Sequence, residues 1–117
     1  MNVAWESFHR ATNELASSAS IKHRLTAAFS NHLKDLEPDS LPPELRPRFE
    51  ELHASLSRVR PLRGETAVWA TVRKMSNDEA EIVARRIVEL LGELARHREQ
   101  LPKTSGRPVL SLYAADG

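Results

Sequence analysis

The chain has 117 residues, of which 40% are hydrophobic and 28% charged, a balance typical of one globular domain rather than of a disordered segment. Its 17 Lys and Arg stand against 16 Asp and Glu, and the resulting net charge of +1 excludes a strongly basic nucleic-acid binder and an acidic tail protein. The absence of cysteine excludes disulfides, zinc ribbons, iron–sulfur clusters and a cysteine nucleophile.

Two N-terminal segments, residues 3–18 and 21–36, carry apolar side chains at helical spacing. The serine-rich stretch between them predicts a break with Ser20 as the N-cap of the second helix, and one long bent helix is the alternative. The apolar face of the first segment consists of Trp5, Phe8, Thr12, Leu15 and Ala19. The apolar face of the second segment consists of Ile21, Leu25, Ala28, Phe29, Leu33 and Leu36.

Proline and glycine divide the middle of the chain. Pro38 lacks a backbone N–H and ends the second helix, so residues 37–43 are predicted to form a loop. A third helix is expected to begin within residues 43–47, and a second loop, residues 58–64, precedes a short helix over residues 65–75. The apolar face of the third helix consists of Leu45, Phe49, Leu52, Leu56 and Val59. The apolar side of the short helix consists of Val68, Trp69, Val72 and Met75.

A capping box opens the last predicted helix. Ser76 is the expected N-cap and Glu79 stands three residues later, so the helix should begin here, run to about Arg98 and end before Pro102. Its apolar positions span roughly 160° of the helical wheel, wider than a minimal surface stripe, which predicts packing against several other helices at the centre of the fold. These positions are Ala80, Val83, Ala84, Ile87, Val88, Leu90, Leu91, Leu94 and Ala95.

Together these segments predict an all-α protein, a compact bundle of four to five helices over residues 1–101. A short C-terminal tail, residues 102–117, follows; it is expected to be extended, and its apolar pentad could dock on the body or on a partner. The first residues lack a basic stretch followed by an apolar run, and no segment reaches the ~18 apolar residues that a bilayer requires. We therefore expect a cytoplasmic protein that has no membrane partner.

Several patterns that carry chemistry are absent or misplaced. Glu6-x-x-His9 and Glu50-x-x-His53 match the pattern of di-iron bundles, but the wheel places both glutamates on the solvent side, whereas a di-metal site needs inward ligands. The four glycines form neither a P-loop nor a dinucleotide turn, and no serine lies in a Gly-x-Ser-x-Gly elbow. We expect no enzymatic activity, no cofactor and no metal. His32 is expected to be a hydrogen-bonded core histidine, with a pH-sensitive or ligand-contacting group as the alternative.

Charge is unevenly distributed along the chain. Residues 44–74 hold seven Lys and Arg against four acids, a local charge of +3, while residues 76–100 have a local charge of −2. A helix-turn-helix that reads DNA with the long helix is disfavoured, because acids alternate with arginines on the exposed face of that helix. The leading hypothesis is a small helical protein–protein interaction or regulatory module, with a second copy of itself as one candidate partner. The alternative is a nucleic-acid-associated regulator that uses the basic region 44–74.

Eight residues are predicted to bind the partner. An apolar patch rimmed by arginine would favour a protein partner, and a bare basic groove would favour nucleic acid. The predicted partner-binding residues are Trp69, Val72, Met75, Arg58, Arg60, Arg63, Arg73 and Lys74.

Overall fold

The computed structural model describes the backbone of residues 3–100 and the side chains of residues 3–97. Within that range the regular elements are five α-helices and two short 3-10 turns, with no strand, which confirms the predicted all-α bundle of four to five helices. The predicted stop at Pro102 and the predicted tail, residues 102–117, lie outside the described residues. In chain order the elements are α1 (Val3–Leu15), α2 (Ile21–His32), η1 (Pro38–Ser40), η2 (Pro43–Leu45), α3 (Arg46–Ser55), α4 (Ala67–Val72) and α5 (Asn77–Gln100).

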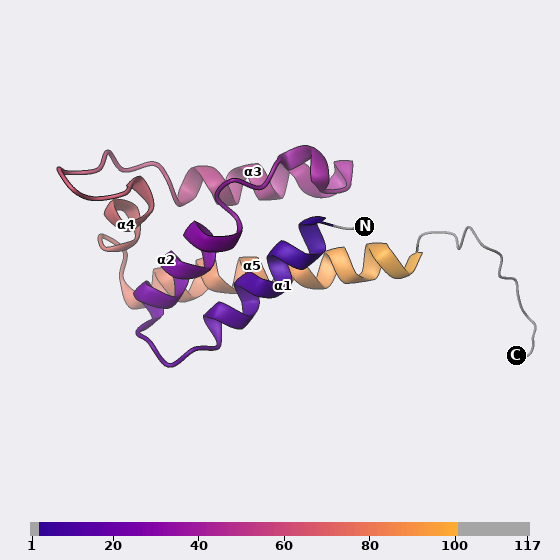
Figure 1. The fold of residues 1–117 in the computed structure, drawn as a ribbon, viewed down its shortest axis with the longest axis horizontal. Helices are drawn as coiled ribbons and strands as arrows, with labels where there is room; N and C mark the ends of the chain where they lie inside the picture. Colours follow the sequence, from indigo (N-terminus) through magenta and orange to yellow (C-terminus); the bar gives the residue numbers. More distant parts are fainter. Residues whose placement is uncertain (1–2, 101–117) are drawn as a thin grey trace, which may run out of the picture.

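The long helix α5 is the element on which the bundle is assembled (Figure 1). It packs against α1, α2 and α3, as its wide apolar face predicted, while α1 and α2 also pack against each other. The short helix α4 contacts α2 and lies at one end of the molecule, near the start of α5 (Figure 1). No helix within residues 3–100 is long and apolar enough to cross a membrane.

The core joins the predicted apolar faces of four helices. The rings of Phe8, Phe29 and Phe49 are fully buried, and those of Phe8 and Phe49 meet edge to face with centroids 5.9 Å apart. Ile87 and Leu94 of α5 are also fully buried and complete the same cluster. Burial of these large apolar side chains is the main force that holds the helices together.

Side-chain caps define where three helices begin. Ser20 accepts a hydrogen bond from the His23 N–H, which confirms it as the N-cap of α2. The predicted capping box is also confirmed: the Ser76 N–H donates to Glu79 Oε1 over 2.8 Å, and the Glu79 N–H donates to Ser76 Oγ over 3.0 Å. The cap of α4 was not predicted. Thr66 accepts from the Trp69 N–H, so this helix begins two residues later than the periodicity indicated.

The first two helices are shorter than predicted. Helix α1 ends at Leu15, whose carbonyl accepts a hydrogen bond of 2.8 Å from the Arg24 guanidinium, so one acceptor at the helix end is satisfied. The buried face of α1 consists of Ala4, Phe8, Ala11 and Leu15. The predicted Trp5 and Thr12 are only partly buried, and Ala19 is exposed beyond the end of the helix. Helix α2 ends at His32, so Leu36, only partly buried, lies beyond the helix.

The apolar face of α5 is narrower than predicted. Val88 is 46% exposed, because it lies at the edge of the predicted stripe, beyond the reach of the neighbouring helices. Ala80, Ile87 and Leu94, near the middle of the stripe, are fully buried. Ile82, which was not part of the predicted face, is 49% exposed in the first turns of the helix.

Candidate interaction surface

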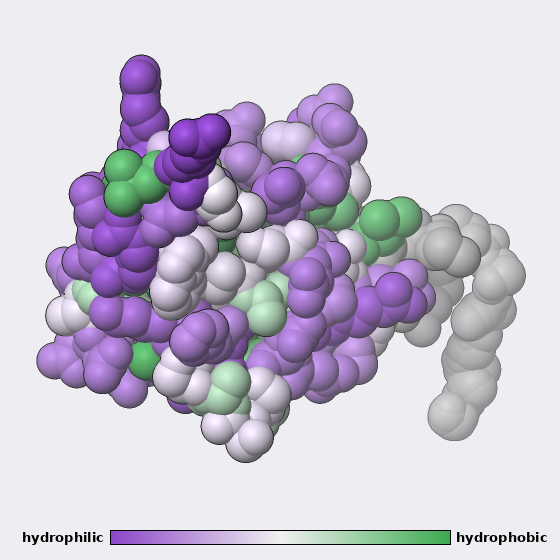
Figure 2. Space-filling view, turned by 60° about the vertical axis from the view of Figure 1, so that its left-hand side comes forward, coloured by the Kyte–Doolittle hydropathy of each residue, from purple (hydrophilic) through white to green (hydrophobic). Residues whose placement is uncertain are grey.

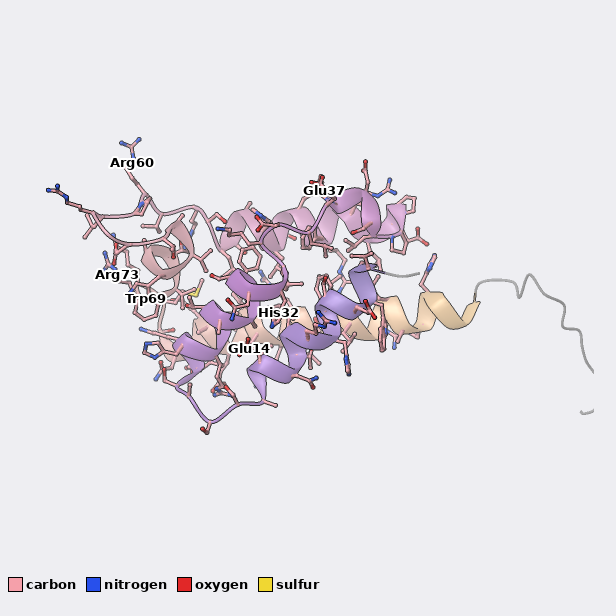
Figure 3. All side chains as sticks on the ribbon, viewed as in Figure 1. Glu14, His32, Glu37, Arg60, Trp69 and Arg73 are labelled. Carbon is pink, nitrogen blue, oxygen red and sulfur yellow. The ribbon has the colours of Figure 1, made fainter. Side chains whose placement is uncertain are left out.

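The connection between α3 and α4, residues 57–66, is called here the arginine loop. Its three arginines, Arg58, Arg60 and Arg63, are exposed, and none forms a hydrogen bond or ion pair with the described residues. Leu62 lies among them and is 64% exposed. Figure 3 shows Arg60 pointing away from the body at this end, and Figure 2, where the end comes forward, shows strongly hydrophilic side chains beside an apolar patch. The loop thus presents three guanidinium groups without partners among the described residues, together with one exposed apolar side chain.

Two internal contacts fix the backbone of the arginine loop. Val59 donates its N–H to Oγ1 of Thr71 over 3.1 Å, and this buried hydroxyl donates in turn to the Ala67 carbonyl over 2.8 Å. Leu62 donates its N–H to Glu65 Oε1 over 3.0 Å, and Glu65 returns its own N–H to the Leu62 carbonyl over 2.9 Å. The loop is therefore attached to α4 at its first half and closed on itself at its second half.

The carboxylate of Glu65 also ties the loop to the end of α4. It pairs with the Arg73 guanidinium through two hydrogen bonds, of 2.5 Å from Nε and 3.3 Å from Nη2. The bonds from Arg73 and from the Leu62 N–H lower the pKa of Glu65 below its ordinary value of 4.5, and the carboxylate raises the pKa of Arg73. The chain turns beside this pair at Gly64, whose φ of +84° is a conformation that glycine adopts without strain.

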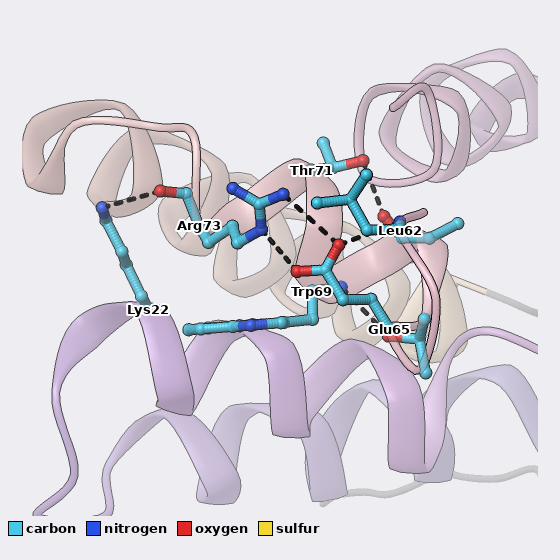
Figure 4. Close-up of polar contacts among 8 residues, drawn as sticks. Lys22, Leu62, Glu65, Trp69, Thr71 and Arg73 are labelled. Atoms are coloured by element: carbon cyan, nitrogen blue, oxygen red, sulfur yellow. Dashed lines mark hydrogen bonds and ion pairs between the residues drawn. The ribbon is translucent and has the colours of Figure 1, made fainter. Parts of the chain in front are cut away.

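Trp69 attaches α4 to α2. Its indole stacks on the ring of His23, with centroids 5.1 Å apart and an interplanar angle of 18°. Lys22, the preceding residue of α2, donates from Nζ to the Arg73 carbonyl over 3.3 Å. Figure 4 shows the indole edge-on, between α2 and the pair of Glu65 and Arg73. The half-buried Trp69 is thus a structural contact within the chain.

The eight predicted partner-binding residues divide into three environments. Trp69 and Arg73 are partly buried and engaged within the chain. Val72 is fully buried and Met75 is 8% exposed, so the prediction that they line a partner-binding face is wrong. Both side chains belong to the core: Val72 is the last residue of α4, a short helix that is mostly buried, and Met75 lies between α4 and α5. The exposed residues of the set are Arg58, Arg60, Arg63 and Lys74.

Sequence reasoning missed the residues that hold the arginine loop in place. Thr71 is twelve positions from Val59, and Glu65 is eight from Arg73, so neither pair matches a helical or strand repeat. Leu62 was the one detectable signal, since an apolar residue among three arginines is visible in the sequence.

A second polar cluster joins α1 to α2 away from the arginine loop. Glu14 Oε1 lies 3.1 Å from His32 Nε2 and accepts a hydrogen bond of the same length from the Asn31 amide. Both contacts lower the pKa of Glu14 below its ordinary value of 4.5, and the hydrogen bond from Asn31 has the larger effect. The expectation of a core position for His32 is corrected, because its side chain is 23% exposed at the end of α2. Among the described residues no group of three or more potential ligands could hold a metal ion.

Comparisons of the chain with known protein families, with curated proteins and with solved structures found no match.

Proposed function

We propose that this protein is a small cytoplasmic, non-enzymatic module for protein–protein interaction, and that the arginine loop contacts the partner. One observation carries the proposal: Arg58, Arg60 and Arg63 are exposed without intrachain partners among the described residues, in the same short loop as the exposed Leu62. An apolar centre with a charged rim is the usual anatomy of a protein interface, in which arginine is enriched.

The fixed backbone of the loop supports this assignment. Association costs free energy for every segment that becomes ordered on binding, and a segment already held in place loses less. Val59 and Leu62 are both hydrogen-bonded within the chain, to Thr71 and Glu65, so the guanidinium groups project from a restrained backbone. Guanidinium groups form paired hydrogen bonds with carboxylates, which favours an acidic patch on the partner.

Nucleic acid is the second candidate, because the region 44–74 has a local charge of +3. Part of that charge is already engaged within the chain. Arg46 donates to the carbonyls of Leu41 and Asp39, and Arg48 lies 3.9 Å from the Glu93 carboxylate. The arginine loop also contains no aromatic side chain on which a base could stack. These features favour the protein partner.

Affinity capture from cell lysate, with and without nuclease, tests the proposal. The test variant changes Arg58, Arg60 and Arg63 to Glu. The matched control changes three exposed cations outside the loop to Glu: Arg10, Lys34 and Arg86. We expect the wild type and the control to retain the same protein after nuclease treatment, and the test variant to lose it. Retention by all three proteins, or loss on nuclease treatment, would overturn the proposal; the second result would favour the nucleic-acid alternative.

A further inference from the structure

We propose that the arginine loop binds a second copy of this chain, at the acidic first turns of its α5. This inference rests on the proposed function and names the partner of the same site. It starts from a second exposed patch, called here the acidic turn and formed by Asp78, Glu81 and Ile82.

The acidic turn has the composition that the arginine loop would bind. Asp78 is exposed and has no ion pair with the described residues. Glu81 is 51% exposed and has only a 3.9 Å contact with Arg85 of its own helix. Ile82 lies beside them, one helical turn after Asp78, and is 49% exposed. An apolar side chain flanked by carboxylates here complements an apolar side chain flanked by guanidinium groups in the loop.

The carboxylate of Glu79, in the same turn, is less available to a partner because it is hydrogen-bonded within the chain. Glu79 accepts the Ser76 N–H in the capping box, so its side chain is held against the helix start. The two acids offered to a partner are therefore Asp78 and Glu81.

Both patches lie at the same end of the molecule. The arginine loop leads into α4, α4 ends at Val72, and α5 begins at Asn77, so the two patches are separated by one short helix and a turn. Figure 1 shows α4, its preceding loop and the start of α5 together at this end. Opposite patches on one end of each copy allow a closed twofold dimer, in which the loop of each chain meets the acidic turn of the other.

The charge pattern favours a second copy over an extended polyanion. The carboxylates of Asp78 and Glu81, at the same end of the molecule, would reduce the attraction of the arginine loop for a polyanion. A second copy supplies both signs, and it pairs each patch with its complement. The near-neutral chain, with +3 in residues 44–74 and −2 in residues 76–100, fits such pairing.

A charge-swap experiment tests the inference by sedimentation equilibrium of the full chain. The basic-loop variant changes Arg58, Arg60 and Arg63 to Glu, and the acidic-turn variant changes Asp78 and Glu81 to Lys. In a dimer of either variant alone, like charges would face one another where the loop of one copy meets the acidic turn of the other. We therefore expect the dissociation constant for self-association to rise by about a hundredfold or more. An equimolar mixture of the two variants restores opposite charges at both contacts and should form a heterodimer.

The controls separate folding from association. Circular dichroism checks that each variant remains helical. If the double variant with Asp78→Lys and Glu81→Lys unfolds, a neutral double variant with Asp78→Asn and Glu81→Gln takes its place. This neutral variant should self-associate more weakly than the wild type. The variant that changes Arg10, Lys34 and Arg86 to Glu should associate like the wild type.

Three results would overturn the inference: a wild type that stays monomeric at low salt, a basic-loop variant that associates normally, or folded variants whose mixture stays monomeric. A monomeric wild type that still captures a protein through the arginine loop would leave the proposed function intact and reject the second copy. A chain that neither self-associates nor captures a protein would reject both.

Discussion

Thr71 is the buried hydroxyl that links the arginine loop to α4. The Thr71→Val substitution keeps the shape of the side chain but removes the acceptor for the Val59 N–H. An unsatisfied buried donor costs about 1–3 kcal/mol, and the part-buried position of this bond places the expected loss of unfolding free energy near the lower end. Urea denaturation measures the loss, and amide exchange should show faster exchange at Val59.

Thr71→Ser is the matched control for this prediction. It keeps the hydroxyl, so Val59 should remain protected from exchange. Equal protection of Val59 in the valine and serine variants would show that the hydroxyl does not hold the loop.

Glu14 makes the free energy of unfolding depend on pH. Hydrogen bonds from Asn31 and from His32 lower its pKa in the folded state below 4.5, so this carboxylate stabilises the fold fully above that pH. The contribution is lost as the pH falls through the lowered pKa. We expect the stability advantage of the wild type over Glu14→Gln to shrink on acidification below pH 4.5.

Denaturation of both proteins over a range of pH checks this prediction, together with an NMR titration of the Glu14 carboxyl. A midpoint at or above 4.5, or a stability difference that is constant with pH, would contradict it.

Local signals in the sequence identified the helix starts that depend on caps. Ser20 and the pair of Ser76 and Glu79 were visible because a cap and the helix it starts are neighbours along the chain. The contact that satisfies the end of α1 could not be predicted in this way, because the Arg24 guanidinium of the next helix reaches the Leu15 carbonyl only after the two helices pack. Tertiary contacts of this kind have no periodic signature.

The contribution of the capping box to the stability of α5 can be tested by removing its serine. Ser76→Ala removes the oxygen that accepts the Glu79 N–H, and loss of an N-cap costs about 0.5–2 kcal/mol of unfolding free energy. Ser18→Ala, at an exposed serine between α1 and α2, serves as the control and should change little. Equal midpoints for the two variants in urea denaturation would argue against a stabilising cap.

At the scale of the whole molecule, the fold could be predicted from the sequence further than the candidate site could. Helical periodicity placed Phe8, Phe29 and Phe49 on faces that do form the core. The same periodicity does not indicate which apolar faces become buried within the bundle. Val72 and Met75 were therefore predicted to contact a partner, although both are buried in the core. The packing of all the helices determines which apolar residues remain exposed. The sequence pattern alone therefore does not distinguish the exposed Leu62 and Ile82 from residues of the core.

A chain with a net charge near zero can still have strongly charged surfaces. The arginine loop and the acidic turn contribute opposite charges at one end, and they nearly cancel in the total. Electrostatic association of this kind weakens with added salt, since exposed charges are screened. Net charge alone therefore gives little information about the charged surfaces of this protein.

NMR mapping of backbone amides would show where two copies of the chain make contact. Spectra of the labelled full chain, recorded as its concentration rises, report which amides change on association. If the arginine loop contacts the acidic turn, we expect progressive shifts confined to residues 57–66 and 77–82. These shifts should be lost in the variant that changes Arg58, Arg60 and Arg63 to Glu. Shifts that map instead to α1 or α3, or spectra that do not change with concentration, would contradict this contact.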